Sequence, residues 1–219
     1  MEFNRIIDHT LLRANAREED ILQLCDEARD HNFYSVCVNS KWLTLSSQKL
    51  KFSETLPITV IGFPLGVDSL YLKQKECDEA LRLGAKEIDM VIDLANVFSD
   101  EWKKVENEIK TLARLCDEIP LKVIIETAYL NQNEIAECSK RCDFGGAAFV
   151  KTSTGFAPSG AKEEDIRTIK QNCGHLGIKA SGGIKTYKDA DKMIKAGATR
   201  IGSSASVSMM NEWKALHTL

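Results

Sequence analysis

The sequence predicts a (β/α)8 barrel, and two features of the chain carry this prediction. Short apolar runs alternate with longer amphipathic stretches along the whole chain, and no linker, low-complexity tract or composition shift divides them. A short glycine-alanine motif recurs where a helix is expected to give way to a strand. Eight strand–helix units of about 28 residues each would fill the chain, which suits a barrel of roughly 250 residues. We therefore expect one barrel domain over residues 1–219.

Eight apolar runs are expected to form the barrel wall, and six stretches between them have the apolar periodicity of helices. The expected strands are residues 5–9, 35–39, 58–63, 87–92, 121–127, 147–153, 177–181 and 200–203. The expected helices are residues 19–30, 70–83, 102–117, 133–142, 162–172 and 188–196. An open doubly wound sheet remains the alternative, although its usual first turn, G-x-G-x-x-G, is missing from this chain.

The ends of the expected helices carry recognisable signals. Asn131 followed by Glu134 and Thr186 followed by Asp189 have the spacing of capping boxes at helix starts. The glycine-alanine motif opens residues 84–89, 146–151 and 197–202, where it is followed by two residues and then a strand. Glycine is favoured there because the residue after a helix often takes a left-handed backbone.

Composition excludes several classes of protein. Hydrophobic residues make up 43% of the chain and charged residues 28%, which is enough apolar material for one large core. The net charge of -3 gives no reason to expect nucleic acid or an anionic membrane surface as a partner. No apolar stretch approaches the roughly 20 residues of a membrane span, and the first residues lack the layout of a signal peptide. The sequence therefore favours a cytoplasmic protein.

Cysteine and histidine spacing gives no metal site. The seven cysteines include no C-x-x-C, and the four histidines lie far apart in the sequence. We expect free or buried thiols, as in a reducing cytoplasm, and no metal.

A barrel carries its reactive groups at the carboxyl ends of its strands, and Lys151 lies at such an end. The run before it, residues 147–150, is apolar, so a lysine there is costly unless it is paired or neutral. Taken alone, this lysine could equally extend to solvent or pair with an acid. Lys179 occupies the matching depth of the next strand, and a neighbouring ammonium favours the neutral, nucleophilic form of one amine.

Asp89 lies two strands away from Lys151 and could accept and return protons, or form a structural salt bridge with a lysine. Two lysines and an acid facing one cavity suit imine chemistry better than acyl transfer. A Ser/His/Asp arrangement would need a histidine near these strand ends, where only His9 is available.

A phosphate site is indicated at the last two strands. Gly182 and Gly183 follow the seventh strand, and residues 202–204 (Gly-Ser-Ser) end the eighth, which is where barrels commonly bind phosphate. Glycines permit close approach of backbone N–H groups, Ser204 could add a hydroxyl, and Lys185 could add a positive charge. The pair of glycines alone is equally compatible with a simple turn.

Seven segments spread over essentially the whole chain carry a further pattern. They are IDHTLL at residues 7–12, VCVN at 36–39, VIGFPLG at 60–66, EIDMV at 87–91, KVIIET at 122–127, KTSTGF at 151–156 and KASGGI at 179–184. In this order they resemble the deoxyribose-phosphate aldolase family. The resemblance implies a class I aldolase on a TIM barrel that needs no metal or other cofactor and serves deoxyribonucleotide catabolism. Such an enzyme reversibly splits 2-deoxy-D-ribose 5-phosphate into glyceraldehyde 3-phosphate and acetaldehyde.

The resemblance also assigns roles by position in these segments. Lys151 would form the Schiff base, Lys179 would lower the pKa of Lys151, and Asp89 would relay protons. The implied substrate and pocket residues are Asp8, Thr10, Cys37, Lys122, Thr154, Gly155, Gly182, Gly183, Gly202 and Ser204. Of these, the four glycines and Ser204 match phosphate-binding positions. The expected partners are the sugar phosphate and acetaldehyde, and a homodimer is left open.

Three departures from the family pattern concern single positions. Ala205 follows Ser204 where two serines are common, and Phe156 stands where some members have lysine. Residues 216–219 lack the terminal tyrosine that assists proton transfer in some members. Three rival functions stay open: a phosphate-binding isomerase or epimerase that uses Asp89, a related aldolase for a sugar bisphosphate, and a non-catalytic barrel. The last would be expected to lose at least one of Lys151, Lys179 and Asp89, and all three are present.

Overall fold

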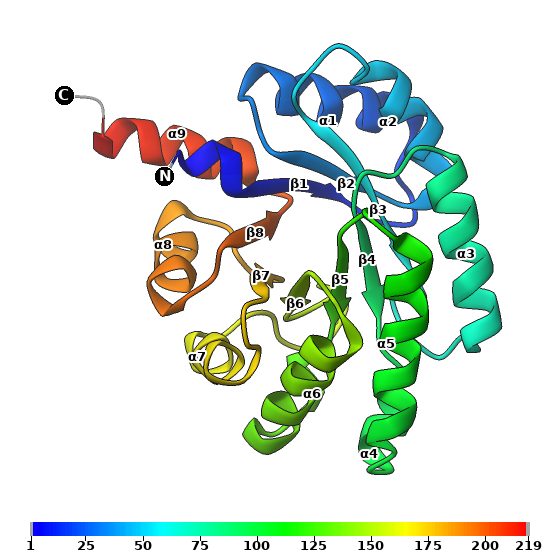
Figure 1. Cartoon of the computed structure of the whole chain (residues 1–219). Helices are drawn as coiled ribbons and strands as arrows, with labels where there is room; N and C mark the ends of the chain where they lie inside the picture. Colours follow the sequence, from blue (N-terminus) through cyan, green and yellow to red (C-terminus); the bar gives the residue numbers. More distant parts are fainter. Residues whose placement is uncertain (1, 218–219) are drawn as a thin grey trace.

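The computed structural model describes residues 2–217, in which eight parallel strands close into a barrel surrounded by helices (Figure 1). The strands are β1 Ile7–Leu11, β2 Ser35–Val38, β3 Leu56–Ile61, β4 Ile88–Val91, β5 Leu121–Ile124, β6 Phe149–Lys151, β7 Gly177–Ser181 and β8 Arg200–Ser203. Each strand pairs with the next in sequence, and β8 closes the barrel against β1. The predicted fold class is confirmed.

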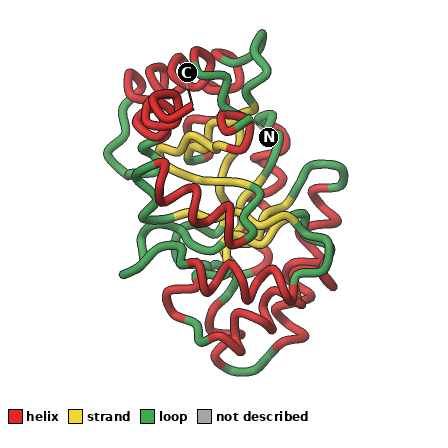
Figure 2. The backbone as a smooth tube through the Cα atoms, turned by 90° about the vertical axis from the view of Figure 1, so that its left-hand side faces the viewer, coloured by secondary structure: helices red, strands yellow, loops and turns green. Residues whose placement is uncertain are grey.

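Helices lie outside the strands on all sides of the barrel, as the tube in Figure 2 shows. They are α1 Glu18–Asp30, α2 Leu43–Lys49, α3 Leu70–Arg82, α4 Leu94–Phe98, α5 Trp102–Cys116, α6 Gln132–Gly145, α7 Glu163–Asn172, α8 Tyr187–Ala196 and α9 Ser206–His217. Short 3-10 helices are η1 Phe3–Ile6, η2 Ser40–Trp42 and η3 Thr127–Tyr129. The six predicted helices are present, whereas α2, α4, α9 and the 3-10 segments were not predicted. Among residues 2–217, no helix combines the length and apolar character needed to cross a membrane.

The strands match their predicted bounds best at the end of the chain, where β7 and β8 agree in full. The first strand begins two residues later than predicted, because residues 3–6 form η1. The fifth predicted strand was too long. It ends at Ile124 because Glu126 takes a left-handed backbone with φ of 51°, which turns the chain out of the sheet.

The glycine-alanine motif forms the same joint three times. Gly84, Gly146 and Gly197 have φ angles of 93°, 81° and 128°, a region that favours glycine. The alanine after each glycine donates its N–H to the carbonyl five residues earlier: Ala85 to Ala80, Ala147 to Cys142 and Ala198 to Met193. This is the hydrogen bond of a Schellman motif. The repeat therefore ends three helices in the same way and leads the chain into the next strand each time.

Apolar packing lies mainly between the helices and the outside of the barrel. One large cluster fills this layer and contains six of the seven cysteines, all seven of which are buried and free. A second, small cluster of Leu12, Cys37, Ile58 and Val60 packs apart from it. Val60 is paired in register with Asp89, and residues paired across parallel strands share a face, so this small cluster lies inside the barrel beside the charged groups described below.

The two ends of the described chain are joined by aromatic contacts. The ring of Phe3 in η1 packs edge-on against Tyr187 of α8 and is stacked with Trp213 of α9, with centroids 5.0 and 6.3 Å apart. In Figure 1 this places η1 and α9 next to each other. The missing terminal tyrosine was noted for residues 216–219. Residues 218 and 219 lie outside the described part of the chain.

Candidate active site

Six buried charged side chains inside the barrel form a closed ring in which acids and bases alternate. In ring order they are Asp8, Lys179, Asp89, Lys122, Glu87 and Arg200. The nitrogen-to-oxygen distances between neighbours lie between 2.6 and 3.1 Å. Three acids and three bases give the ring no net charge, so each buried charge is compensated by its two neighbours.

Lys151 is a seventh charged group attached to this ring. Its Nζ lies 2.7 Å from Asp89 Oδ2, and Lys179 Nζ lies 2.7 Å from the same oxygen. The two lysines are paired in register on β6 and β7, as the sequence predicted from their matching depth. Asp89 on β4 was predicted to face them and does so. The side chain of Lys151 is 3% exposed, so its amine is almost fully removed from bulk water.

The environment acts in opposite directions on the two amines. Burial lowers the pKa of Lys151, and Lys179 lowers it further, while Asp89 opposes both effects. Asp8 and Asp89 raise the pKa of Lys179 despite its burial, so Lys179 keeps its proton. The pKa of Asp89 lies well below its usual range because Lys122, Lys151 and Lys179 together outweigh the cost of burying the carboxylate. The proton that is most easily lost from this cluster is therefore the one on Lys151.

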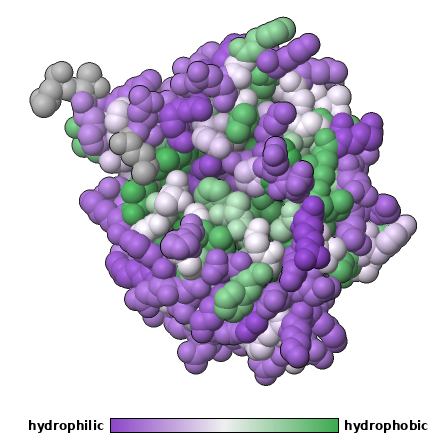
Figure 3. All heavy atoms as spheres, in the orientation of Figure 1, coloured by the Kyte–Doolittle hydropathy of each residue, from purple (hydrophilic) through white to green (hydrophobic). Residues whose placement is uncertain are grey.

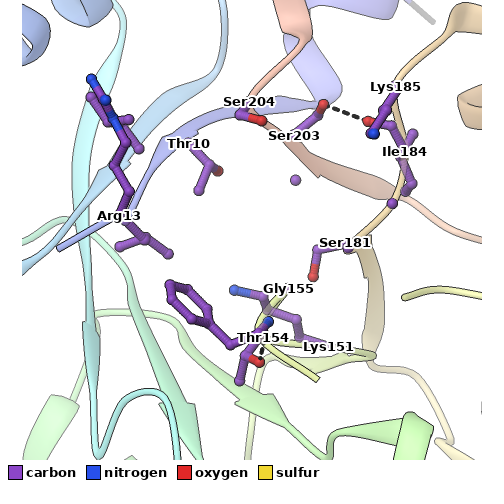
Figure 4. A pocket seen from close by; sticks show the side chains of 16 residues that line it. Thr10, Arg13, Lys151, Thr154, Gly155, Ser181, Ile184, Lys185, Ser203 and Ser204 are labelled. Atoms are coloured by element: carbon purple, nitrogen blue, oxygen red, sulfur yellow. Dashed lines mark hydrogen bonds between the residues drawn. The ribbon is translucent and has the colours of Figure 1, made fainter. Parts of the chain in front are cut away.

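A cavity of about 290 Å³ opens above Lys151 at the carboxyl ends of the strands. The predicted site residues that line it are Thr10, Lys151, Thr154, Gly155, Gly182, Gly183, Gly202 and Ser204. Figure 4 shows Lys151 and Thr154 on one side of the cavity and Ser203, Ser204 and Lys185 on the opposite side. On the face drawn in Figure 3, apolar residues gather toward the middle and hydrophilic residues form the rim.

Five predicted site residues do not line this cavity. Asp8, Asp89, Lys122 and Lys179 belong to the charged ring beneath it, and each is fully buried. Cys37 is buried in the small apolar cluster, where burial raises the pKa of its thiol to about 11. Of these five residues, Asp89 contacts Lys151, which lines the cavity, whereas Thr10 and the glycines face the cavity directly.

The end of the cavity opposite Lys151 is built from backbone. Gly182 and Gly183 have φ angles of 84° and 75°, a backbone conformation that favours glycine, and neither residue carries a side chain that could cover its own peptide groups. Ser203 is occupied in holding this end together: its Oγ donates to Ile184 O at 2.7 Å and accepts from Ala205 N at 3.0 Å. Ser204 is exposed and lies two residues before the start of α9 at Ser206, and the N-terminus of a helix favours an anion.

The loop between β6 and α7 packs against the turn formed by Gly182 and Gly183, called the glycine turn below. Ala161 N donates to the carbonyls of Ser181 and Gly182 at 3.2 and 3.1 Å. Gly160 is packed so closely that a Cβ atom there would lie 2.0 Å from Gly182 O. The position of the glycine turn is therefore set by this loop as well as by β7.

Sequence reasoning missed three charged residues of the site. Glu87 and Arg200 belong to the ring but lie at the amino ends of their strands, whereas a barrel is expected to carry its reactive groups at the carboxyl ends. Alternation could have found Glu87, which is two residues from Asp89 and so shares its face. Glu126 accepts hydrogen bonds from Thr154 through both N and Oγ1, and its side chain is buried beside the cavity.

Among the described residues, the site contains neither a histidine that lines the cavity nor a group of metal-binding side chains. His9 Nε2 lies 2.8 Å from Glu27 Oε2, so its ring faces α1 on the outside of the barrel. The Ser/His/Asp arrangement is thereby excluded for His9. Within residues 2–217, no group of three or more His, Cys, Asp or Glu side chains is placed to hold a metal ion.

Comparison with known proteins identifies the family. The family model described as DeoC/LacD family aldolase matches residues 5–215, which is nearly the whole chain. The chain belongs to this aldolase family. Its relatives include the deoxyribose-phosphate aldolase of Histophilus somni strain 2336, which is 46% identical over 208 residues, covering 94% of this chain and 93% of that protein. The deoxyribose-phosphate aldolase of Caldanaerobacter subterraneus subsp. tengcongensis is 44% identical over 218 residues, covering 98% and 94% of the two chains.

Solved structures agree with this assignment. The structure of the aldolase QR15 matches with a TM-score of 0.94 at 39% identity and covers 100% of this chain and 99% of its own. A tetrameric deoxyribose phosphate aldolase from Aeropyrum pernix matches with a TM-score of 0.87 at 31% identity, with coverages of 96% and 90%. The DeoC/LacD aldolase fold thus extends over the whole described chain, and the protein is an aldolase.

Proposed function

We propose that this aldolase reversibly cleaves 2-deoxy-D-ribose 5-phosphate to D-glyceraldehyde 3-phosphate and acetaldehyde, with Lys151 as the Schiff-base nucleophile. One observation carries the proposal: of the three lysines that contact Asp89, Lys151 is the one that lines the cavity. The names of the relatives support the choice of substrate.

The charge balance explains why this lysine would be reactive. A protonated Lys151 would give the ring and this lysine together a net charge of +1, of which the nearby Glu126 offsets a part, and an excess buried charge is costly. Loss of its proton leaves three acids and three bases in the ring. The neutral amine lies at the end of β6 and faces the cavity, where a carbonyl group can reach it.

The proposed reaction uses these groups in sequence. The amine of Lys151 attacks the aldehyde carbon of the open-chain sugar, and water leaves to give an iminium ion. The hydroxyl on the third carbon then loses its proton, through water, to Asp89. The bond between the second and third carbons breaks, its electron pair neutralises the iminium as an enamine, and glyceraldehyde 3-phosphate is released. Protonation and hydrolysis of the enamine release acetaldehyde and restore the amine.

The phosphate would occupy the opposite end of the cavity. Backbone N–H groups at Gly182 and Gly183, the hydroxyl of Ser204 and the ammonium of Lys185 offer donors to a dianion there, and Gly202 lines the same end without a side chain. Holding the distant end of the sugar fixes the distance between its aldehyde and Lys151, so binding energy is converted into positioning. Thr10, Thr154 and Gly155 would line the path between the two ends.

Trapping of the imine tests the proposal. Treatment with acetaldehyde and borohydride should attach an ethyl group to Lys151, detected by mass spectrometry of peptides, and Lys151→Met should lose both the label and the cleavage of deoxyribose 5-phosphate. Unchanged circular dichroism would show that this variant is folded. A label on another lysine, or full activity of the variant, contradicts the assignment. An isomerase or epimerase would give no label, and a bisphosphate aldolase would not take acetaldehyde as donor.

A further inference from the structure

Arg200 and Glu87 lie at the end of the charged ring that is remote from the cavity. Arg200 is the first residue of β8 and Glu87 directly precedes β4, whereas Lys151 is the last residue of β6. Arg200 Nη1 lies 2.9 Å from Asp8 Oδ1 and 3.1 Å from Glu87 Oε2, so one nitrogen bridges two acids. Neither residue touches the cavity. The proposed reaction assigns them no step.

The contacts around Arg200 hold it in one place. Its guanidinium lies 3.5 Å from the ring centroid of Tyr34, and the hydroxyl of Tyr34 donates to Glu87 Oε1 at 3.1 Å. Arg200 and Glu87 are both buried. These contacts hold the side chains of Arg200 and Glu87 in place. Neutralising either residue would change the net charge of the ring.

Two arms of the ring lead from Arg200 to the same carboxylate. One arm runs through Asp8 and Lys179 to Asp89 Oδ2, which also accepts from Lys151. The other runs through Glu87 and Lys122 to Asp89 Oδ1. Both arms end on Asp89. The charge around this carboxylate therefore depends on whether the two arms are joined at their far end. Arg200 and Glu87 are the pair that closes them.

We propose that Arg200 and Glu87 are positioning residues for the proposed aldol reaction, which close the ring and thereby fix the net charge that Lys151 meets. This inference rests on the proposed function only for its catalytic meaning. With both residues in place the ring is neutral. When Lys151 has lost its proton, the ring and this lysine together carry no net charge. Loss of Arg200 leaves an excess of negative charge beneath Lys151, and loss of Glu87 leaves an excess of positive charge.

The charged and titratable groups that face these residues come from all the elements packed against them. Lys151 meets Asp89 from β4, Lys179 from β7, Cys37 from β2 and Glu126 after β5. Arg200 meets Asp8 from β1, Glu87 before β4 and Tyr34 before β2. Of the three groups around Arg200, Asp8 and Glu87 belong to the ring and Tyr34 does not, so the effect of a substitution reaches Lys151 through the ring.

The test is a pair of single substitutions with opposite expected effects. The pH dependence of Lys151 acetylation by acetic anhydride, measured by peptide mass spectrometry, reports the ionisation of its amine without requiring activity. Arg200→Gln should move the midpoint to higher pH and Glu87→Gln to lower pH. Each shift should be about one pH unit, the order expected for one unit charge at an effective dielectric constant of about 20. The pH profile of kcat/KM should move in the same directions.

A double variant and a surface variant provide the controls. Glu87→Gln combined with Arg200→Gln removes one charge of each sign and should return the midpoint to within about 0.3 pH unit of the parent value. Arg167→Gln breaks the exposed pair with Glu163, which lies 2.7 Å away on α7, and should leave the midpoint unchanged.

The outcomes separate charge from simple loss of structure. Opposite shifts with recovery in the double variant support the proposal. Shifts of both single variants in the same direction, or a folded Glu87→Gln with no shift, overturn it. If Arg200→Gln does not fold, Glu87→Gln alone decides, because its shape is nearly that of the parent. A borohydride label on another lysine would remove the proposed function and leave the acetylation result intact.

Discussion

Replacement of Gly160 by alanine tests how the proposed phosphate end is built. Gly160 does not contact the cavity, and it has no left-handed backbone that would strain an alanine. A Cβ atom at this position would lie 2.0 Å from Gly182 O and 2.2 Å from the carbonyl carbon. Contacts below 3.0 Å are essentially never seen for a Cβ atom, so this contact must open by about 1 Å, and we expect the Gly182 peptide to move. The N–H groups of Gly182 and Gly183 would move with it.

The size of the effect follows from the hydrogen bonds at risk. A hydrogen bond to a charged group contributes about 2 kcal/mol, which corresponds to about a 30-fold change in affinity. We therefore expect Gly160→Ala to lower kcat/KM for deoxyribose 5-phosphate by about 30-fold, mainly through KM. Unphosphorylated deoxyribose has no phosphate to lose, so its kcat/KM should stay within about twofold of the parent value.

Steady-state cleavage of both sugars, coupled to detection of the product aldehyde, gives the comparison. Gly146→Ala is the matched control. A Cβ atom at Gly146 would meet no other atom within 4 Å, and Gly146 ends α6 on the amino-end side of β6. Its left-handed backbone predicts some loss of stability and no discrimination between the sugars. Equal losses of kcat/KM on both sugars with Gly160→Ala would refute the role of the loop in placing the phosphate.

Two further predictions address the amine and the helix ends. Lys179→Leu should raise the pKa of Lys151, because a like charge is removed and Asp89 loses a counterion; the pH at which kcat/KM rises should therefore increase, and an unchanged pH profile would argue against this interaction. Asn131→Ala removes the Oδ1 that accepts from Asn133 N and Glu134 N at 2.9 and 3.1 Å, so thermal unfolding should show a loss of about 1 kcal/mol and a Tm lower by roughly 2–4 °C. A Tm equal to that of the parent would mean that the capping box contributes nothing measurable.

The sequence allowed the cluster of Lys151, Lys179 and Asp89 to be predicted because strands have a strict two-residue alternation. Lys151, Lys179 and Asp89 each stand in a short apolar run, so their depth and face follow from counting. The same counting fails for Glu126, because its position depends on a left-handed backbone at a residue other than glycine. Its interaction with Thr154 could not be read from either segment.

The parts of the fold that were missed are short or depend on tertiary contacts. Helix α4 has five residues, which is too few to show an apolar period, and its N-cap is Asp93, whose side chain accepts from Ala95 N. The closed ring is a different case. Its members were partly visible as single charged residues, but the pairing of Arg200 with Asp8 joins positions 192 residues apart and needs the barrel to close.

That separation has a consequence for the newly synthesised chain. Asp8 is made among the first residues and Arg200 among the last, so the ring is incomplete until β8 has left the ribosome and closed against β1. Before that moment Lys151 is an ordinary ammonium group with the low reactivity of any exposed lysine. The proposed nucleophile therefore acquires its buried and paired environment only when the barrel is complete, and an unfinished or unfolding chain would not capture aldehydes through it.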